Sequence, residues 1–138
     1  MQIITDNIKW ILLVSGILTS SMVYALFAPE AAMMNTLGVS LSDPAANLIV
    51  RSWGSLVSLM GVMMIVGALV PKYRTLVVVI AGTSKSVFVG IFVAFGSQYL
   101  GQAAYVIALD VAVVLAFAIY LYNSRGSEKL LEVQTQAG

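Results

Sequence analysis

Residues 73–99 read YRTLVVVIAGTSKSVFVGIFVAFGSQY, a long apolar stretch with one lysine, Lys85, near its middle. An ammonium at the centre of a membrane helix costs about 2.5–3.5 kcal/mol on insertion scales. The twelve Leu, Ile, Val and Phe residues between Thr75 and Phe95 each favour insertion by about 0.3–0.6 kcal/mol, so the stretch is still predicted to span a membrane. A charge at this depth is expected to have a partner.

The composition of the whole chain is that of a membrane protein. Its 138 residues are 60% hydrophobic and 9% charged, whereas soluble proteins carry about 25% charged residues. A net charge of +1 without a basic run argues against nucleic acid as a partner. The chain has no Cys and no His, which excludes disulfides, thiol chemistry and haem or zinc sites built on those residues. Met60, Met63 and Met64 could serve as soft ligands for Cu(I). Methionine also packs adaptably between helices, and on that interpretation we expect no metal and no cofactor.

Four apolar segments predict an all-α integral membrane protein, an antiparallel bundle of four transmembrane helices in a single domain. Proline punctuates the chain: Pro29 follows the first segment, Asp43-Pro44 is an N-cap with proline at the first helical position, and Pro71 stops the second helix. The expected spans are residues 10–27, 47–70, 74–97 and 102–122, followed by a polar tail at 123–138 that frays beyond one or two helical turns.

Between the first two spans, Pro29 and the residues after it suit a short helix lying in the membrane interface and closed by Gly38. Small residues then repeat at helical spacing on two spans. Gly16, Thr19 and Ser20 form such a stripe on the first span, which favours close helix packing. The second span carries small or polar residues on the face that we expect to point into the bundle, namely Arg51, Gly54, Ser55, Ser58 and Gly61.

The orientation in the membrane follows from the basic residues, which are enriched in cytoplasmic loops. One side of the predicted bundle collects Lys9, Lys72, Arg74, Arg125 and Lys129. The other side has Arg51, together with the acidic Glu30 and Asp43. Both termini are therefore predicted to be cytoplasmic.

Asp110, in the fourth span, is the expected partner of Lys85. Lys85 lies ten residues past Thr75, about 15 Å at 1.5 Å per residue, and Asp110 lies twelve residues before Tyr122, about 18 Å from the same face. The two helices are consecutive and antiparallel, so they are expected to be neighbours. The depths predict an ion pair near mid-membrane.

Two roles are open for this pair. It is either a structural contact that fixes the register of the last two helices, or a binding site for a proton, an ion or a polar headgroup. The hydroxyl residues expected to line it are Ser58, Thr83, Ser84 and Ser86.

Arg51 also has two interpretations. It lies about one turn inside the second helix and can reach the interface along its own stem. Alternatively it faces inward above the pair, where it meets Glu30 or an anionic group entering from that side.

The layout resembles small bacterial four-span proteins, the DoxX-like and related families. The matching stretches are FAPEAAMMNTLG after the first span, VRSWGSLVSLMG opening the second, the basic AGTSKSVFVG in the third and the acidic ALDVAVV in the fourth. Arg and Glu are commoner in that pattern where this chain has Lys85 and Asp110. The resemblance implies the bacterial inner membrane and no settled activity.

These observations predict a multi-pass membrane protein with a Lys–Asp site, either a small transporter or a ligand- or lipid-binding protein. The site residues would be Lys85 and Asp110 with Arg51 at the entrance. An accessory or structural subunit of a larger membrane complex is the alternative. Expected partners are membrane lipids and either further copies of the chain or other membrane subunits. Without His, Cys or a metal cluster, an enzyme is not expected.

Overall fold

The computed structural model describes the backbone of residues 2–136 and the side chains of residues 3–126. Its elements are all helical, and none of the described residues forms a strand. In chain order they are α1 (Gln2–Ser20), the 3-10 turn η1 (Ser21–Val23), α2 (Tyr24–Phe27), α3 (Pro29–Leu37), α4 (Pro44–Leu69), α5 (Pro71–Phe95), the 3-10 turn η2 (Ser97–Tyr99) and α6 (Leu100–Gln136).

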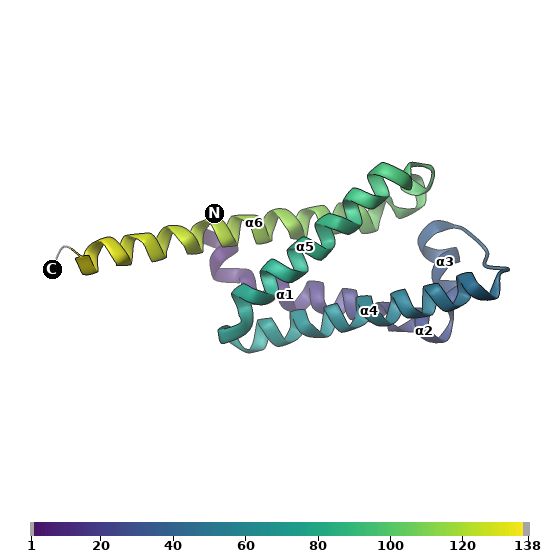
Figure 1. Ribbon diagram of the computed structural model, residues 1–138, viewed down its shortest axis with the longest axis horizontal. Helices are drawn as coiled ribbons and strands as arrows, with labels where there is room; N and C mark the ends of the chain where they lie inside the picture. Colours follow the sequence, from purple (N-terminus) through teal and green to yellow (C-terminus); the bar gives the residue numbers. More distant parts are fainter. Residues whose placement is uncertain (1, 137–138) are drawn as a thin grey trace.

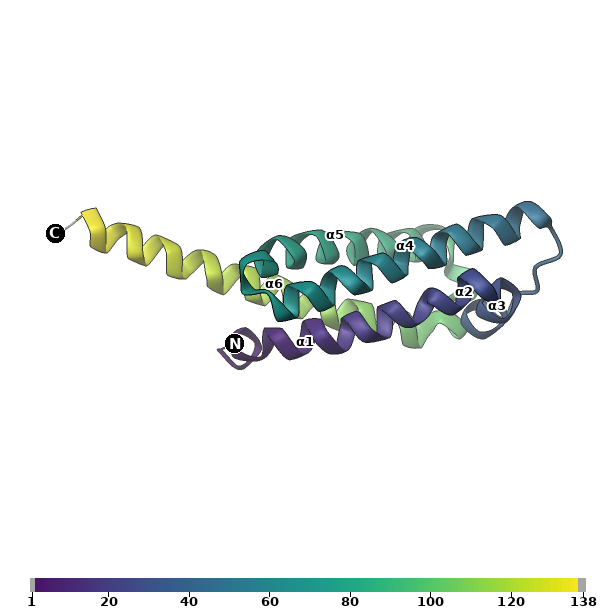
Figure 2. The same cartoon turned by 90° about the horizontal axis from the view of Figure 1, so that it is seen from below.

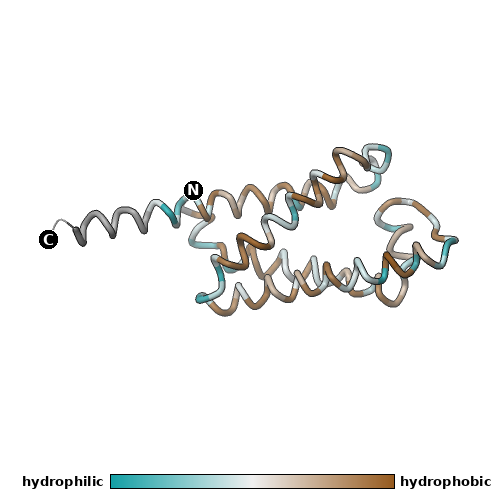
Figure 3. The backbone as a smooth tube through the Cα atoms, in the orientation of Figure 1, coloured by the Kyte–Doolittle hydropathy of each residue, from teal (hydrophilic) through white to brown (hydrophobic). Residues whose placement is uncertain are grey.

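Within the described residues, four helical segments are long and apolar enough to cross a membrane: Ile3–Phe27, Pro44–Leu69, Pro71–Phe95 and Ser97–Gly126. They form an elongated bundle in which the start of α1, the α4–α5 turn and the far part of α6 lie at one end (Figures 1 and 2). The hydropathy colouring in Figure 3 is apolar along these helices, with a hydrophilic stretch in the middle of α5. The prediction of four long apolar helices is confirmed, and their length and composition fit a multi-pass membrane protein.

The helix ends follow the punctuation of the sequence. Asp43 caps α4 by accepting a hydrogen bond from the backbone N–H of Ala45 (3.0 Å), and Pro44 takes the first helical position. Gly38 ends α3 in the left-handed conformation (φ 69°), which glycine adopts without a steric penalty. These predictions are confirmed. By contrast, α6 does not stop near Tyr122 but continues as one helix to Gln136.

The first and second spans approach each other closely because glycines face each other across α1 and α4. A Cβ atom at Gly16 would lie 2.9 Å from the carbonyl oxygen of Gly61, and one at Gly61 would collide with the backbone nitrogen and hydroxyl of Ser20. Gly54 and Ser58 are buried on the same face of α4. The small-residue faces predicted for these two spans are therefore packed against each other, as small-residue membrane helices pack.

The apolar core fills the end of the bundle that holds the start of α1 and the α4–α5 turn. Its buried members come from four helices and are Ile8, Leu12, Met64, Ala68, Val77, Val78, Ala81 and Phe117. A second, smaller cluster at the other end joins α2, α3 and α4 through Ala25, Ala32 and Val50. On α5 the buried residues are Val77, Val78, Ala81 and Lys85, so the described part of α5 beyond Lys85 has no buried residue.

Candidate functional site: the ion pair between α5 and α6

Lys85 and Asp110 form an ion pair between α5 and α6, as predicted from their depths. The ammonium nitrogen Nζ donates to the Asp110 carboxylate oxygen Oδ1. The side chains retain 11% and 15% of their full exposure. Both charges are thus largely removed from the surroundings and compensate each other, which is the arrangement that makes intramembrane charges tolerable.

The pair leaves hydrogen-bonding capacity unused. A lysine ammonium has three N–H donors, and an ionised carboxylate has two oxygen acceptors. Among the described residues, Lys85 donates to Asp110 alone, and Asp110 accepts from Lys85 alone. The remaining donors and the second carboxylate oxygen can therefore bind water, an ion or a polar group without breaking a bond to another part of the protein.

The hydroxyls near Lys85 in sequence do not contact the pair. Thr83 donates to the carbonyl oxygen of Val79 and Ser86 donates to that of Gly82, each at 2.8 Å. Thr83, Ser84 and Ser86 are exposed in the isolated chain. Thr83 and Ser86 line a groove of about 440 Å³ between α5 and α6, on the surface of that helix pair.

Ser58 lies on α4 and is buried, but its hydroxyl is engaged within its own helix. It donates to the carbonyl oxygen of Gly54 at 2.7 Å. The structure therefore brings two of the predicted site residues, Lys85 and Asp110, into contact, while the four hydroxyl residues form no hydrogen bond with them.

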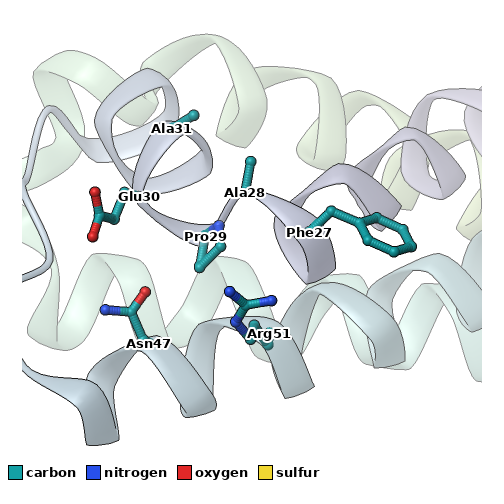
Figure 4. A pocket seen from close by; sticks show the side chains of 7 residues that line it. All are labelled: Phe27, Ala28, Pro29, Glu30, Ala31, Asn47 and Arg51. Atoms are coloured by element: carbon teal, nitrogen blue, oxygen red, sulfur yellow. The ribbon is translucent and has the colours of Figure 1, made fainter.

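Arg51 lies at the end of α4 that starts at Pro44, in a separate pocket. Its Nη1 donates to the carbonyl oxygen of Leu26 at 2.5 Å. This carbonyl is left unpaired in its helix because the chain breaks at Ala28 (φ −131°, ψ 68°) before α3 begins. Arg51 forms no ion pair with Glu30, although both line the same pocket of about 370 Å³ (Figure 4).

Arg74 plays a comparable role at the opposite end of α4, whereas the sequence predicts it only as one of the basic residues that set the orientation. Its Nε and Nη2 donate to the carbonyl oxygens of Gly67 (3.3 Å) and Ala68 (3.1 Å), the last turn of α4. The residue four positions after Gly67 is Pro71, which has no N–H to offer. An arginine shortly after a helix-ending proline is the sequence signal that would have identified this contact.

The position of the pair distinguishes it from an ordinary core contact. Ala81 and Phe117 belong to the apolar core, and Lys85 and Asp110 lie one and two turns farther along their helices, on the side away from that core. The α5–α6 hairpin continues past the pair to its turn, where Figure 1 shows it angled away from α4. On α5 the pair thus stands at the last buried position, while on α6 Ala103 is still buried beyond it.

No family model, curated protein or solved structure matches this chain significantly. The resemblance to the DoxX-like families stays a prediction.

Proposed function

We propose that this protein is a small membrane carrier or ligand-binding protein whose site is the Lys85–Asp110 pair. The observation that supports this most is the unused hydrogen-bonding capacity of a charge pair that has no other partner among the described residues. A pair that served packing alone would be expected to have its remaining donors satisfied by neighbouring side chains. Here the nearest hydroxyls in sequence are bound to their own helix.

The mechanism we propose is exchange of ionic partners. A proton on Asp110 neutralises the carboxylate, which weakens its attraction for the ammonium and frees both groups for a polar solute. Loss of that proton restores the carboxylate, which re-forms the pair and displaces the solute. Occupancy and protonation are coupled in this scheme because the same carboxylate takes part in both.

The test is proton flux into liposomes that contain the purified protein and an internal pH-sensitive dye. We expect flux above that of empty liposomes, with Asp110→Asn and Lys85→Met each reducing it to the background. Thr83→Val is the matched control, because Thr83 is near in sequence but does not contact the pair. Equal flux in the wild type and both single variants, with all three folded, would contradict transport at this site.

An accessory subunit is the second candidate, favoured by the exposed far half of α5. Beyond Lys85 this helix buries no described residue, and Val87, Ile91, Val93 and Phe95 are each at least half exposed. Because the chain has no cysteine, a single Gly90→Cys variant would report a neighbouring helix through oxidative cross-linking in membranes. Cross-linking no higher than that expected for a cysteine that faces only lipid would count against a partner, whether a second copy or another subunit.

For the orientation we propose cytoplasmic termini in a bacterial inner membrane. The support is the excess of Lys and Arg at the end of the bundle where α1 starts, including Lys9, Lys72 and Arg74. In this orientation the short helix α3 lies in the outer interface. Cysteine labelling from either side of the membrane, at Lys72→Cys and at Ser42→Cys, tests both statements.

A further inference from the structure

A second charged site lies where the first span ends and the second span begins. Its pocket is lined by Phe27, Ala28, Pro29, Glu30, Ala31, Asn47 and Arg51. Figure 4 shows the Arg51 guanidinium near Pro29, with the Glu30 carboxylate and the Asn47 amide on the other side of the pocket. The pocket therefore holds a positively charged and a negatively charged side chain that lie apart from each other.

Neither charge is neutralised by a neighbour within the described residues. Among these residues the ion pair is that of Lys85 and Asp110, away from this pocket. Glu30 accepts no hydrogen bond from them. Arg51 uses one of its five N–H donors on the Leu26 carbonyl, which fixes the guanidinium in place and leaves four donors. A fixed guanidinium with free donors is suited to a phosphate group, which it can bind through two parallel hydrogen bonds.

Glu30 and Asn47 offer the complementary chemistry. Asn47 donates weakly through Nδ2 to the Asp43 carbonyl (3.4 Å), and its amide oxygen accepts nothing from the described residues. A carboxylate and an amide oxygen that line the same pocket suit a primary ammonium, which has three donors and no acceptor. An anion alone would be repelled by Glu30, so the ligand should carry both charges.

The depth of the pocket points to a lipid rather than a solute. Phe27 ends the first apolar segment, and α4 begins at Pro44. Arg51 lies seven residues into α4, about 10 Å along the helix, which places its charged end near the headgroup level of a bilayer. Phe27 is 75% exposed beside the pocket and offers an apolar surface for an acyl chain.

We propose that this pocket binds the headgroup of a phospholipid that carries both a phosphate and a primary ammonium, as phosphatidylethanolamine does. The phosphate lies at Arg51, and the ammonium lies between Glu30 and Asn47. This site is independent of the ion pair between α5 and α6, so it stands whether or not Lys85 and Asp110 carry a solute.

The test is native mass spectrometry of the purified protein in detergent with equal amounts of phosphatidylethanolamine, phosphatidylcholine and phosphatidylglycerol. We expect phosphatidylethanolamine to bind about tenfold more tightly than either of the others, a difference of about 1.4 kcal/mol. Glu30→Gln should abolish this preference without abolishing binding, because the phosphate contact remains. Arg51→Gln should weaken all three lipids, whereas the exposed Arg125→Gln should change none.

Three outcomes overturn the proposal: equal binding of the three lipids by the wild type, an unchanged preference in Glu30→Gln, or equal effects of Arg51→Gln and Arg125→Gln. Arg51→Gln also removes the hydrogen bond to Leu26, so if that variant does not fold, the preference measured in Glu30→Gln decides. Soluble phosphoethanolamine is the second arm. We expect it not to displace the lipid, and displacement at equal concentration would mean that the pocket binds a free phosphate compound instead.

Discussion

The two halves of this bundle are held together by different forces. α1 and α4 touch backbone to backbone through Gly16 and Gly61, without an ion pair between described residues. α5 and α6 are joined near the middle of their apolar segments by Lys85 and Asp110. Dispersion between closely packed helices needs small residues but no charge, whereas an intramembrane ion pair stabilises only when both charges are present.

The two halves also differ in how far their helices are buried, and therefore in where a ligand could enter. In α4 the buried positions run along most of the helix, from Val50 to Ala68. In α5 they stop at Lys85. A helix that is packed along most of its length serves as a scaffold, while a helix whose last buried residue is a charged one can admit a ligand or a partner at that point. This contrast is why we place the proposed carrier site on α5 and α6.

Replacing Gly61 should have the largest effect, because it attacks the scaffold directly. In Gly61→Leu the new side chain would collide with Ser20 and approach the Gly16 carbonyl, whose oxygen is already 2.7 Å from a Cβ at this position. We expect a loss of more than about 3 kcal/mol of unfolding free energy. Thermal unfolding in detergent, followed by the fluorescence of Trp10 and Trp53, measures it.

Gly90→Leu is the matched control on α5, because a Cβ at Gly90 meets no atom within 4 Å. Equal losses in the two variants would show that the contrast between the two halves is wrong.

Arg74→Gln should have an intermediate effect, since Arg74 stabilises the turn that joins the two halves. The change removes the donors to the Gly67 and Ala68 carbonyls. We expect a loss of about 1 kcal/mol, the usual contribution of such hydrogen bonds. Arg125→Gln removes the same charge from an exposed position and should be neutral in the same unfolding assay. An unchanged unfolding free energy in Arg74→Gln would show that Arg74 does not cap α4.

Gly90→Ala should have the smallest effect, with the opposite sign. Nothing is displaced, and alanine reduces the conformational entropy of the unfolded chain. We expect a gain of at most about 1 kcal/mol. A clear loss of stability in intact membranes but not in detergent would indicate that a neighbouring helix packs on this face in the membrane.

Much of the fold follows from the sequence because local rules decide it. Asp43-Pro44 and Gly38 set helix ends through their own backbone chemistry. The Lys85–Asp110 contact could be predicted because two antiparallel neighbours with charges at equal depth have few other partners.

The surroundings of the pair were harder to predict. In a helix each residue turns by about 100°, so Ser84 and Ser86 lie on other faces of α5 than Lys85 although they are next to it in sequence. Ser86 donates to the Gly82 carbonyl instead of the pair. The partner of Arg51 depends on a backbone break at Ala28 that exposes the Leu26 carbonyl. Such a contact joins residues 25 positions apart and has no local signature.

Exchanging the two charges tests the central claim most directly. Lys85→Asp and Asp110→Lys, made singly, each bring like charges together inside the bundle and should cost about 3–5 kcal/mol. The double variant restores an ion pair in reversed order, so we predict that it recovers most of the unfolding free energy in detergent. If the double variant is instead as unstable as the sum of the two single changes, Lys85 and Asp110 do not interact, and the site proposed between α5 and α6 does not exist.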